Sequence, residues 1–431
     1  MAPTAARAPA DLDHLVALLE DLVGLMLRSS GEGAETVAGI VDDVARAYGG
    51  QADVLLNAES AAVSVTVAGR SRTFVVRQFP DVSRMDRTIA AKALVVDISR
   101  GRTDLASARA RLSAIVDSPD PYPWWLRLVG IVLFSVGFAP AVQRTWYEVG
   151  STAVLASITA VLAVAAATRP RLALVFPLLA STAVATTALA VFAQDSSHGG
   201  KLLIMLPALF FLVPGDILSA AATELAAGSL TTGAVRLVYA TFLLVQLYIG
   251  VLVGAALTGT SLGSFTDTQA PDNLHYGAVL LGWTVFAVGA LLAFGIPWPV
   301  FGWMLLLVYL PLAVQAGAAK VAGTVVGTFL AATMLSAAAG LLARPAHRPP
   351  RLVLVLAGFF TLTVGSLGLR GLTVLAGGDR VQGFQDLGEL VTQVVVIALG
   401  LVVGAAFVPR PTWRDARSRG RGSQASMVLG P

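Results

Sequence analysis

The chain contains no cysteine and has few charged residues for its length of 431 residues. The absence of cysteine excludes disulfides, thiolate nucleophiles and zinc or iron–sulfur sites held by cysteine. Four scattered histidines do not suggest a metal site either. Only 13% of the residues are charged, 56% are hydrophobic and the mean hydropathy is +0.75, which is too apolar for a water-soluble globule. The composition predicts an integral membrane protein, and we expect no cofactor.

The charged residues are concentrated at the start of the chain. Residues 1–123 carry 13 Lys and Arg and 16 Asp and Glu, whereas the rest of the chain carries only 17 and 10. We therefore expect a small soluble domain at 1–123, followed by a membrane domain. The first thirty residues are too rich in charge for the apolar core of a secretory signal, so we expect the amino terminus to stay in the cytoplasm.

The pattern within the first 123 residues predicts a small α+β domain. Apolar residues at three- and four-residue steps from Leu12 to Met26 predict an amphipathic helix. Alternating apolar and polar residues at 61–67 and 72–79 predict a hairpin that turns at Gly69. Further helices are expected at 35–48, 84–100 and 104–116, the last of them capped by Asp104. No phosphate-binding loop or paired nucleophile and base is present, so a regulatory or gating role fits this domain better than catalysis.

Ten later stretches are long and apolar enough to cross a bilayer, which takes roughly 20 residues each. They lie near 125–142, 149–168, 172–193, 201–228, 233–257, 275–295, 298–317, 321–342, 351–376 and 387–408. With both termini inside, eleven Lys and Arg of the connecting and terminal segments fall on the cytoplasmic side and five on the other, and Arg236 is among the eleven. This favours a cytoplasmic soluble domain. The basic tail at 409–431 is then a disordered topology anchor, and we expect no nucleic-acid partner.

The membrane domain contains an internal repeat. At an offset of 150 residues, 201–257 match 351–407 without a gap, and 17 of the 57 positions are identical, several of them glycines. The repeats are expected at 124–258 and 274–408. Because each holds five spans, the second must enter the membrane in the opposite orientation, which is the inverted-repeat arrangement of secondary transporters. The expected fold is therefore a polytopic α-helical membrane protein, with ten transmembrane helices in two inverted five-helix repeats after a small α+β cytoplasmic domain.

Two corresponding interruptions of the apolar spans indicate where a substrate would bind. Pro214, Gly215 and Asp216 interrupt the fourth span, and the repeat places Gly365 and Ser366 at the matching point of the ninth. Proline cannot donate the backbone hydrogen bond and glycine loosens the chain, so the helix should break there. Broken spans in matching positions indicate a binding site near the bilayer midplane, where the start of a half-helix can face a substrate carboxylate.

Three ionisable residues near these breaks are candidates for charge transfer. Asp216 could hold an ammonium group or carry the coupling proton, and it could equally cap a helix. Glu224 follows by eight residues, about 80° round the same helix, and either takes part in proton coupling or lies at the cytoplasmic edge. Arg370 could offset a carboxylate or extend from a helix end to the membrane interface.

The chain resembles the threonine/serine exporter (ThrE) family along most of its length. The motifs that carry this resemblance are LMLRSSG at 25–31, DLASARARLSAI at 104–115, LVPGDIL at 212–218 and GSLGLRG at 365–371. Val364 stands where the family commonly has a proline. The resemblance implies a multi-pass protein of the plasma (inner) membrane that exports threonine and serine, driven by the proton motive force.

The expected partners are a small amino-acid substrate, protons and the lipid bilayer, whereas the oligomeric state is left open. A dicarboxylate exporter of the same architecture, handling a substrate such as succinate, is the alternative, because two-chain members of the family are linked to succinate export. A membrane-embedded hydrolase is a third hypothesis, which the lack of a nucleophile paired with a base disfavours. We expect no enzymatic activity.

Overall fold

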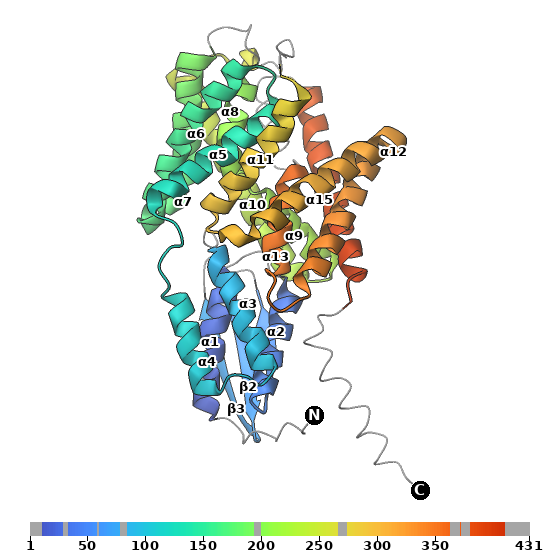
Figure 1. Ribbon diagram of the computed structural model, residues 1–431. Helices are drawn as coiled ribbons and strands as arrows, with labels where there is room; N and C mark the ends of the chain where they lie inside the picture. The colour runs from blue at the N-terminus through green and yellow to red at the C-terminus, as the bar shows by residue number, and fades with distance from the viewer. Residues whose placement is uncertain are drawn as a thin grey trace.

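The computed structural model describes residues 11–28, 33–57, 60–77, 84–193, 200–265, 274–362, 371 and 380–409. Figure 1 shows two parts: a small unit of helices and strands, called the head below (residues 12–117), and a larger bundle of helices that begins at Trp124. The head lies at one end of the bundle. The basic tail predicted at 409–431 lies, apart from its first residue, outside the described residues.

The head is built from four helices and a three-stranded antiparallel sheet in the order β1-β2-β3. Its elements are α1 (Leu12–Arg28), α2 (Ala34–Ala47), β1 (Gly50–Leu56), β2 (Ser60–Val67), β3 (Arg70–Arg77), α3 (Met85–Ser99) and α4 (Leu105–Val116). The predicted helices and the hairpin are confirmed. The structure adds a third strand to the hairpin, β1, which the sequence analysis did not predict.

The head has its own hydrophobic core. One face of β2, with Val63 and Val65 fully buried, packs against apolar residues of α1, α2 and α3, including Leu15 and Leu94. The predicted cap of α4 is present, since Asp104 accepts a hydrogen bond from the backbone N–H of Ser107. The side chain and backbone of Ser107 both stabilise the charged carboxylate, and they lower the pKa of Asp104 below its ordinary value of 3.8.

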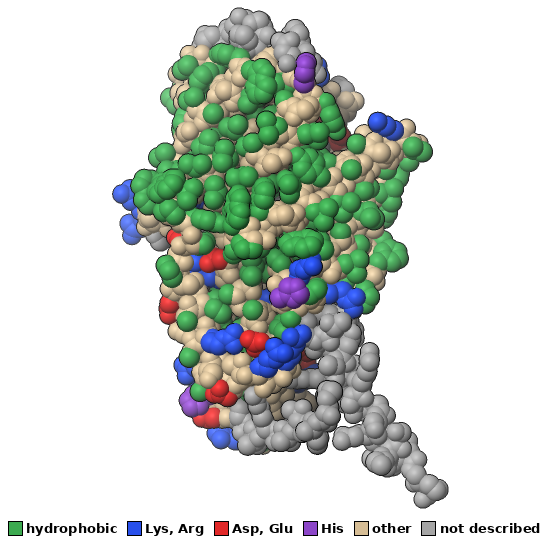
Figure 2. All heavy atoms as spheres, in the orientation of Figure 1, with side chains coloured by type: hydrophobic (Ala, Val, Ile, Leu, Met, Phe, Trp, Pro, Cys, Tyr) green, Lys and Arg blue, Asp and Glu red, His purple; other side chains and the backbone are tan. Residues whose placement is uncertain are grey.

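The bundle contains long apolar helices and several that are broken or bent. They are α5 (Trp124–Val142), α6 (Trp146–Ala167), α7 (Pro170–Thr187) with the π-helix η1 (Ala188–Phe192), α8 (Lys201–Leu209) with η3 (Phe210–Leu212), α9 (Gly215–Ala226), α10 (Leu230–Leu257), η4 (Leu262–Ser264), α11 (Tyr276–Ala293), η5 (Trp298–Val300), α12 (Phe301–Ala343), α13 (Arg351–Phe359) with η6 (Phe360–Leu362), and α15 (Arg380–Ala406). Apolar side chains cover most of the visible face of the bundle, while charged ones gather on the head (Figure 2).

Seven helices of the described part are long and apolar enough to cross a membrane, and eight if a bent pair counts as one span. That pair is Lys201–Leu212 with Gly215–Ala226, which meet at an angle of 61°. The spans predicted at 298–317 and 321–342 correspond to the two parts of α12, which meet at a bend at Gly323, and the span predicted at 351–376 runs into residues that are not described. The structure therefore gives a polytopic helical membrane protein, and its described residues do not by themselves show the ten spans predicted.

α12 consists of two helical parts that meet at a sharp bend. Gly323 has a φ of +84° and a ψ of 167°, which lie outside the helical region and suit only a residue without a Cβ. Beyond this bend the chain turns back on itself, because Gln315 donates a hydrogen bond of 3.0 Å to the hydroxyl of Thr328. In a straight helix these two residues would be about 20 Å apart.

Small residues set the closest contacts between helices. α5 and α11 cross in antiparallel directions, with Gly130 beside Ala293 and Gly137 beside Gly282. At Gly289 of α11 a Cβ atom would lie 2.2 Å from the backbone nitrogen of Phe134, so only glycine fits. This contact joins the start and the middle of the bundle.

The head is attached to the bundle through backbone carbonyls. Lys92 of α3 donates to the carbonyl oxygens of Ala343 (2.6 Å), Arg348 (2.8 Å) and Pro349 (3.2 Å), which lie at the end of α12 and in the turn after it. Tyr122 donates to the carbonyl of Ile296 at 2.9 Å, and burial raises the pKa of its hydroxyl, which keeps it protonated. The end of the bundle that carries these contacts is called head-proximal below, and the opposite end head-distal.

Candidate functional site

The break predicted in the fourth span is confirmed. The chain leaves η3, becomes extended at Val213, and starts α9 at Gly215 in a new direction. Pro214 is the N-cap residue of α9. A backbone N–H at this position would have no partner within the helix, so proline is tolerated there. Both Pro214 and Gly215 are buried. The start of α9 thus faces the interior of the bundle at a point where an apolar span changes direction.

Asp216 lies in the first turn of α9, half-buried next to the break. Its carboxylate lies close to the backbone N–H groups of Ile217 and of Asp216 itself at the start of the helix. It also lies within electrostatic range of the Arg236 guanidinium. The capping role and a role in charge transfer are therefore compatible at this position.

A buried ion pair joins α9 to α10. Arg236 Nη1 lies 2.9 Å from Glu224 Oε1, and the two side chains are only 10% and 5% exposed. The helices approach closely because Gly233 lies against Leu225, where a Cβ atom would come within 2.7 Å of the leucine side chain. Removing a charged pair from water is costly, so its presence here requires that each charge keep its partner.

Arg236 corrects one prediction. It was counted among the cytoplasmic residues that orient the protein, whereas it lies inside α10, buried against Glu224. The count becomes ten to five, which still favours the same orientation. Glu224 is buried as well, while Thr232 at the start of α10 contacts the carbonyl of Leu56 in the head, so both alternatives for Glu224, proton coupling and a place at the cytoplasmic edge, stay predictions. Arg236 is the site residue that the sequence reasoning missed, although an arginine within a predicted span was the signal that could have revealed it.

The second half of the bundle contributes α15 to this region, because α9 packs against α15. Asp386 of α15 is buried and accepts a hydrogen bond from Gln382 at 2.8 Å. Gly371 lies directly beside it. The other candidate residues of this half, Gly365, Ser366 and Arg370, lie outside the described residues. Within the described part, no three His, Asp or Glu side chains gather in a way that could hold a metal ion.

The apolar helices and the broken span define a multi-pass helical membrane protein with ionisable groups buried beside the break. Residues 22–258 match the model of the family described as "Putative threonine/serine exporter". The chain therefore belongs to the threonine/serine exporter family.

A curated relative from Mycobacterium tuberculosis (strain ATCC 25618 / H37Rv), named "Probable threonine/serine exporter", is 24% identical over 401 residues. The alignment covers 88% of this chain and 74% of the relative. No solved structure matches the chain. Both the family and this relative are described as exporters, which makes the chain a transporter of small molecules by family.

Proposed function

We propose that the protein exports threonine and serine across the plasma membrane as a secondary transporter that exchanges them for protons. The observation that carries this proposal is the broken span with Asp216 at the start of α9, beside the buried pair of Glu224 and Arg236. Membership of the family supplies the substrate class. Nothing in the proposal requires an enzymatic step.

The proposed architecture is ten spans in two inverted repeats, at 124–258 and 274–408. Two packing contacts support it. In the first half, Gly250 and Gly254 of α10 lie against Leu178 and Ala185 of α7. The residues 150 positions later are Gly400 and Gly404 of α15. They lie in the same way against Phe329 and Ser336 of the second part of α12. The equivalent first helices, α5 and α11, cross in antiparallel directions, as inverted repeats require. The bend at Gly323 supports counting α12 as two spans.

The substrate would bind between the two breaks. We place its carboxylate at the start of α9, near Pro214 and Gly215, because the backbone N–H groups and the helix dipole there favour a negative group. Asp216 would hold the ammonium group. The matching positions Gly365 and Ser366 would complete the site from the other repeat, with Arg370 as a further charge partner.

Proton coupling follows from the balance of charges at this place. With Asp216 and Glu224 ionised and Arg236 protonated, the three residues carry a net charge of −1. One positive charge, either a proton or the ammonium group of the substrate, neutralises them, and burial makes the uncompensated state costly. A proton that enters from outside would therefore displace the ammonium group from Asp216, while Glu224 stays paired with Arg236 or takes the proton in its turn. Inward proton flow is thereby linked to outward substrate flow.

The orientation proposed is with the head and both termini in the cytoplasm. The distribution of lysine and arginine supports it, at ten to five after the correction for Arg236. The head contacts the head-proximal ends of helices, through Lys92 and the backbone N–H of Met85. The head would then act on the cytoplasmic entrance as a regulatory or gating unit.

Efflux of labelled threonine from proteoliposomes, with and without an imposed proton gradient, tests this proposal. We expect the gradient to stimulate efflux, and excess unlabelled serine inside to compete with threonine. Excess succinate inside should leave threonine efflux unchanged. Competition by succinate, or efflux of succinate without efflux of threonine, would instead support a dicarboxylate exporter of the same architecture.

A further inference from the structure

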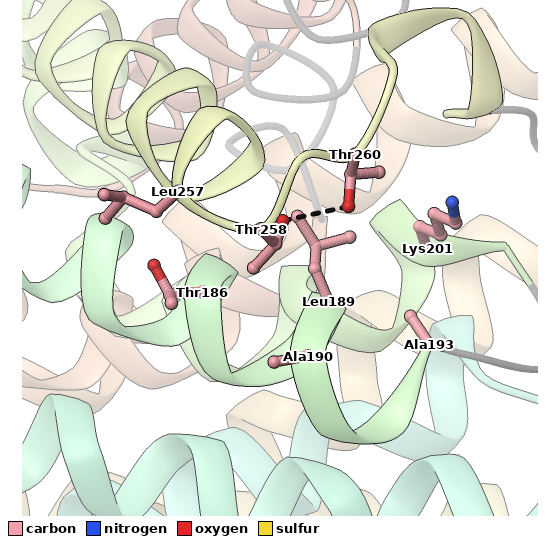
Figure 3. Close-up of a pocket in the computed structure, with 8 residues that line it drawn as sticks. All are labelled: Thr186, Leu189, Ala190, Ala193, Lys201, Leu257, Thr258 and Thr260. Carbon is pink, nitrogen blue, oxygen red and sulfur yellow. Dashed lines mark hydrogen bonds between the residues drawn. The ribbon is translucent and has the colours of Figure 1, made fainter.

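A pocket lies at the head-distal end of the bundle, away from the broken span's midpoint. Its volume is about 520 Å³, within the range of roughly 300–1,000 Å³ that is usual for small-molecule sites. It is lined by Thr186, Leu189, Ala190, Ala193, Lys201, Leu257, Thr258 and Thr260. Figure 3 shows these residues coming from the end of α7 and its π-helix, the start of α8, and the end of α10 with the turn after it.

Lys201 supplies a positive charge at one side of the pocket. Its ammonium group donates a hydrogen bond of 2.8 Å to the hydroxyl of Ser264, which in turn donates to the carbonyl of Ser261. An ammonium group has three N–H donors, and within the described part of the chain Ser264 accepts from one of them. Lys201 is thus held in place and can still donate to an anionic group, for which a carboxylate is the ordinary partner.

The threonine hydroxyls supply acceptors. Thr186 donates to the carbonyl of Thr182, and Thr258 donates to the carbonyls of Gly254 and Ala255. Because their hydrogens are used within their own helices, the oxygens of Thr186 and Thr258 keep acceptor capacity. Thr260 bonds to Thr258 at 2.9 Å (Figure 3). Hydroxyl oxygens with no hydrogen to offer suit an ammonium group rather than a second carboxylate.

The pocket therefore combines a cation, acceptor oxygens and the small apolar side chains of the π-helix. A π-helix is rare and often marks a functional position, and η1 places Leu189 and Ala190 in the wall of this pocket. We propose that this pocket is a second binding site for the zwitterion of a small α-amino acid, with Lys201 on its carboxylate and the oxygens of Thr186 and Thr258 on its ammonium group. This inference rests on the proposed function.

The pocket and the break lie at opposite ends of one helix. α8 begins at Lys201 and runs with η3 to the break at Pro214, a length of about 20 Å at 1.5 Å per residue. A substrate released at the break would meet this pocket before leaving on the head-distal side. The pocket would thus be a binding site on the path by which the substrate is released.

The lack of cysteine allows a direct test. In the full-length protein, Thr260→Cys introduces the only thiol, placed at the pocket, and Ala190→Cys provides a second position if the first variant does not fold. The rate of alkylation by a maleimide in proteoliposomes of phosphatidylcholine is then measured with and without threonine. At ten times its Kd, threonine should slow alkylation about tenfold. Threoninamide, which lacks the carboxylate, should protect much less.

Matched lysine variants identify the contact. Adding Lys201→Met should weaken protection by threonine about tenfold, because a charged hydrogen bond is lost, whereas Lys320→Met, an exposed lysine on α12, should leave it unchanged. Absence of protection in protein that transports threonine would overturn the inference. Protection by phosphatidylglycerol in the vesicles, and not by threonine, would overturn it in favour of a lipid headgroup site. Protection is a binding measurement, so failure of transport alone would count against the proposed function and not against this pocket.

Discussion

At the scale of single residues, Glu224 and Arg236 form a buried ion pair between two helices of the bundle. Neither charge is solvated, and each depends on the other. Removing one partner from such a pair usually destabilises a protein by about 3–5 kcal/mol, whereas replacing both partners is far milder. A variant that removes one partner and a variant that replaces both therefore distinguish a requirement for charge balance from a requirement for either residue alone.

We expect Arg236→Met to lower the free energy of unfolding by about 3–5 kcal/mol, and Glu224→Gln combined with Arg236→Met to recover most of this loss. Denaturant unfolding of the detergent-solubilised protein measures both. Equal destabilisation by the single and the double variant would show that the charges are not coupled. An exposed arginine of the head, Arg109, provides the control, since Arg109→Met should change stability little.

The cap of α4 gives the head a dependence on acidity. Since the folded-state pKa of Asp104 is lowered by Ser107, the stabilisation is complete above the ordinary value of 3.8 and is lost as the pH falls through the lowered value. Protection of the Ser107 and Ala108 amides against hydrogen exchange, corrected for intrinsic rates, should therefore fall on acidification. In Asp104→Asn this pH dependence should disappear. A profile that is the same in both proteins would contradict the assignment.

At the scale of elements, close helix contacts depend on individual glycines. Gly289 and Gly277 both lie in α11. Of these two, only Gly289 lies so close to the backbone of another helix that a Cβ atom would clash with it. Gly289→Ala should destabilise the protein by about 3 kcal/mol or more, because α5 must move away. Gly277→Ala meets nothing within 4 Å and should be neutral or stabilising by up to about 1 kcal/mol. Thermal unfolding midpoints in detergent compare the two, and similar midpoints would argue against the α5–α11 contact.

Elements with strong local signals were predictable from the sequence, and those defined by tertiary contacts were not. The hairpin at Gly69, the cap at Asp104 and the break at Pro214 each depend on the chemistry of a few neighbouring residues. β1 was missed because its seven residues gain their pairing from β2. The separation of two spans between 317 and 321 was predicted, whereas the position of the bend at Gly323 depends on the backbone conformation of that glycine.

The candidate site was predictable in the same partial way. Pro214 and Gly215 mark the break by themselves, whereas the pairing of Glu224 with Arg236 depends on how α9 and α10 fold against each other at Gly233. Glu224 and Arg236 are twelve positions apart in the chain, and the turn between the helices sets which side chains of α9 and α10 meet. Periodicity along one helix cannot report such a contact.

At the scale of the whole molecule, the proposed orientation can be tested with single thiols, since the natural chain has none. Ser113→Cys lies on the exposed surface of the head, and Ser261→Cys lies at the head-distal end. In intact cells, a membrane-impermeant maleimide should label Ser261→Cys at once and Ser113→Cys only after permeabilisation. The reverse pattern would place the head outside and exclude the proposed direction of proton flow.

The central claim is that a proton and the substrate's ammonium group compete for the net negative charge at the break. The measurement that tests it most directly is gradient-stimulated efflux of labelled threonine from proteoliposomes, for the wild type and Asp216→Asn at matched levels of folded protein. The account predicts that the wild type responds to the gradient and that Asp216→Asn does not. Wild-type efflux from Asp216→Asn would contradict it.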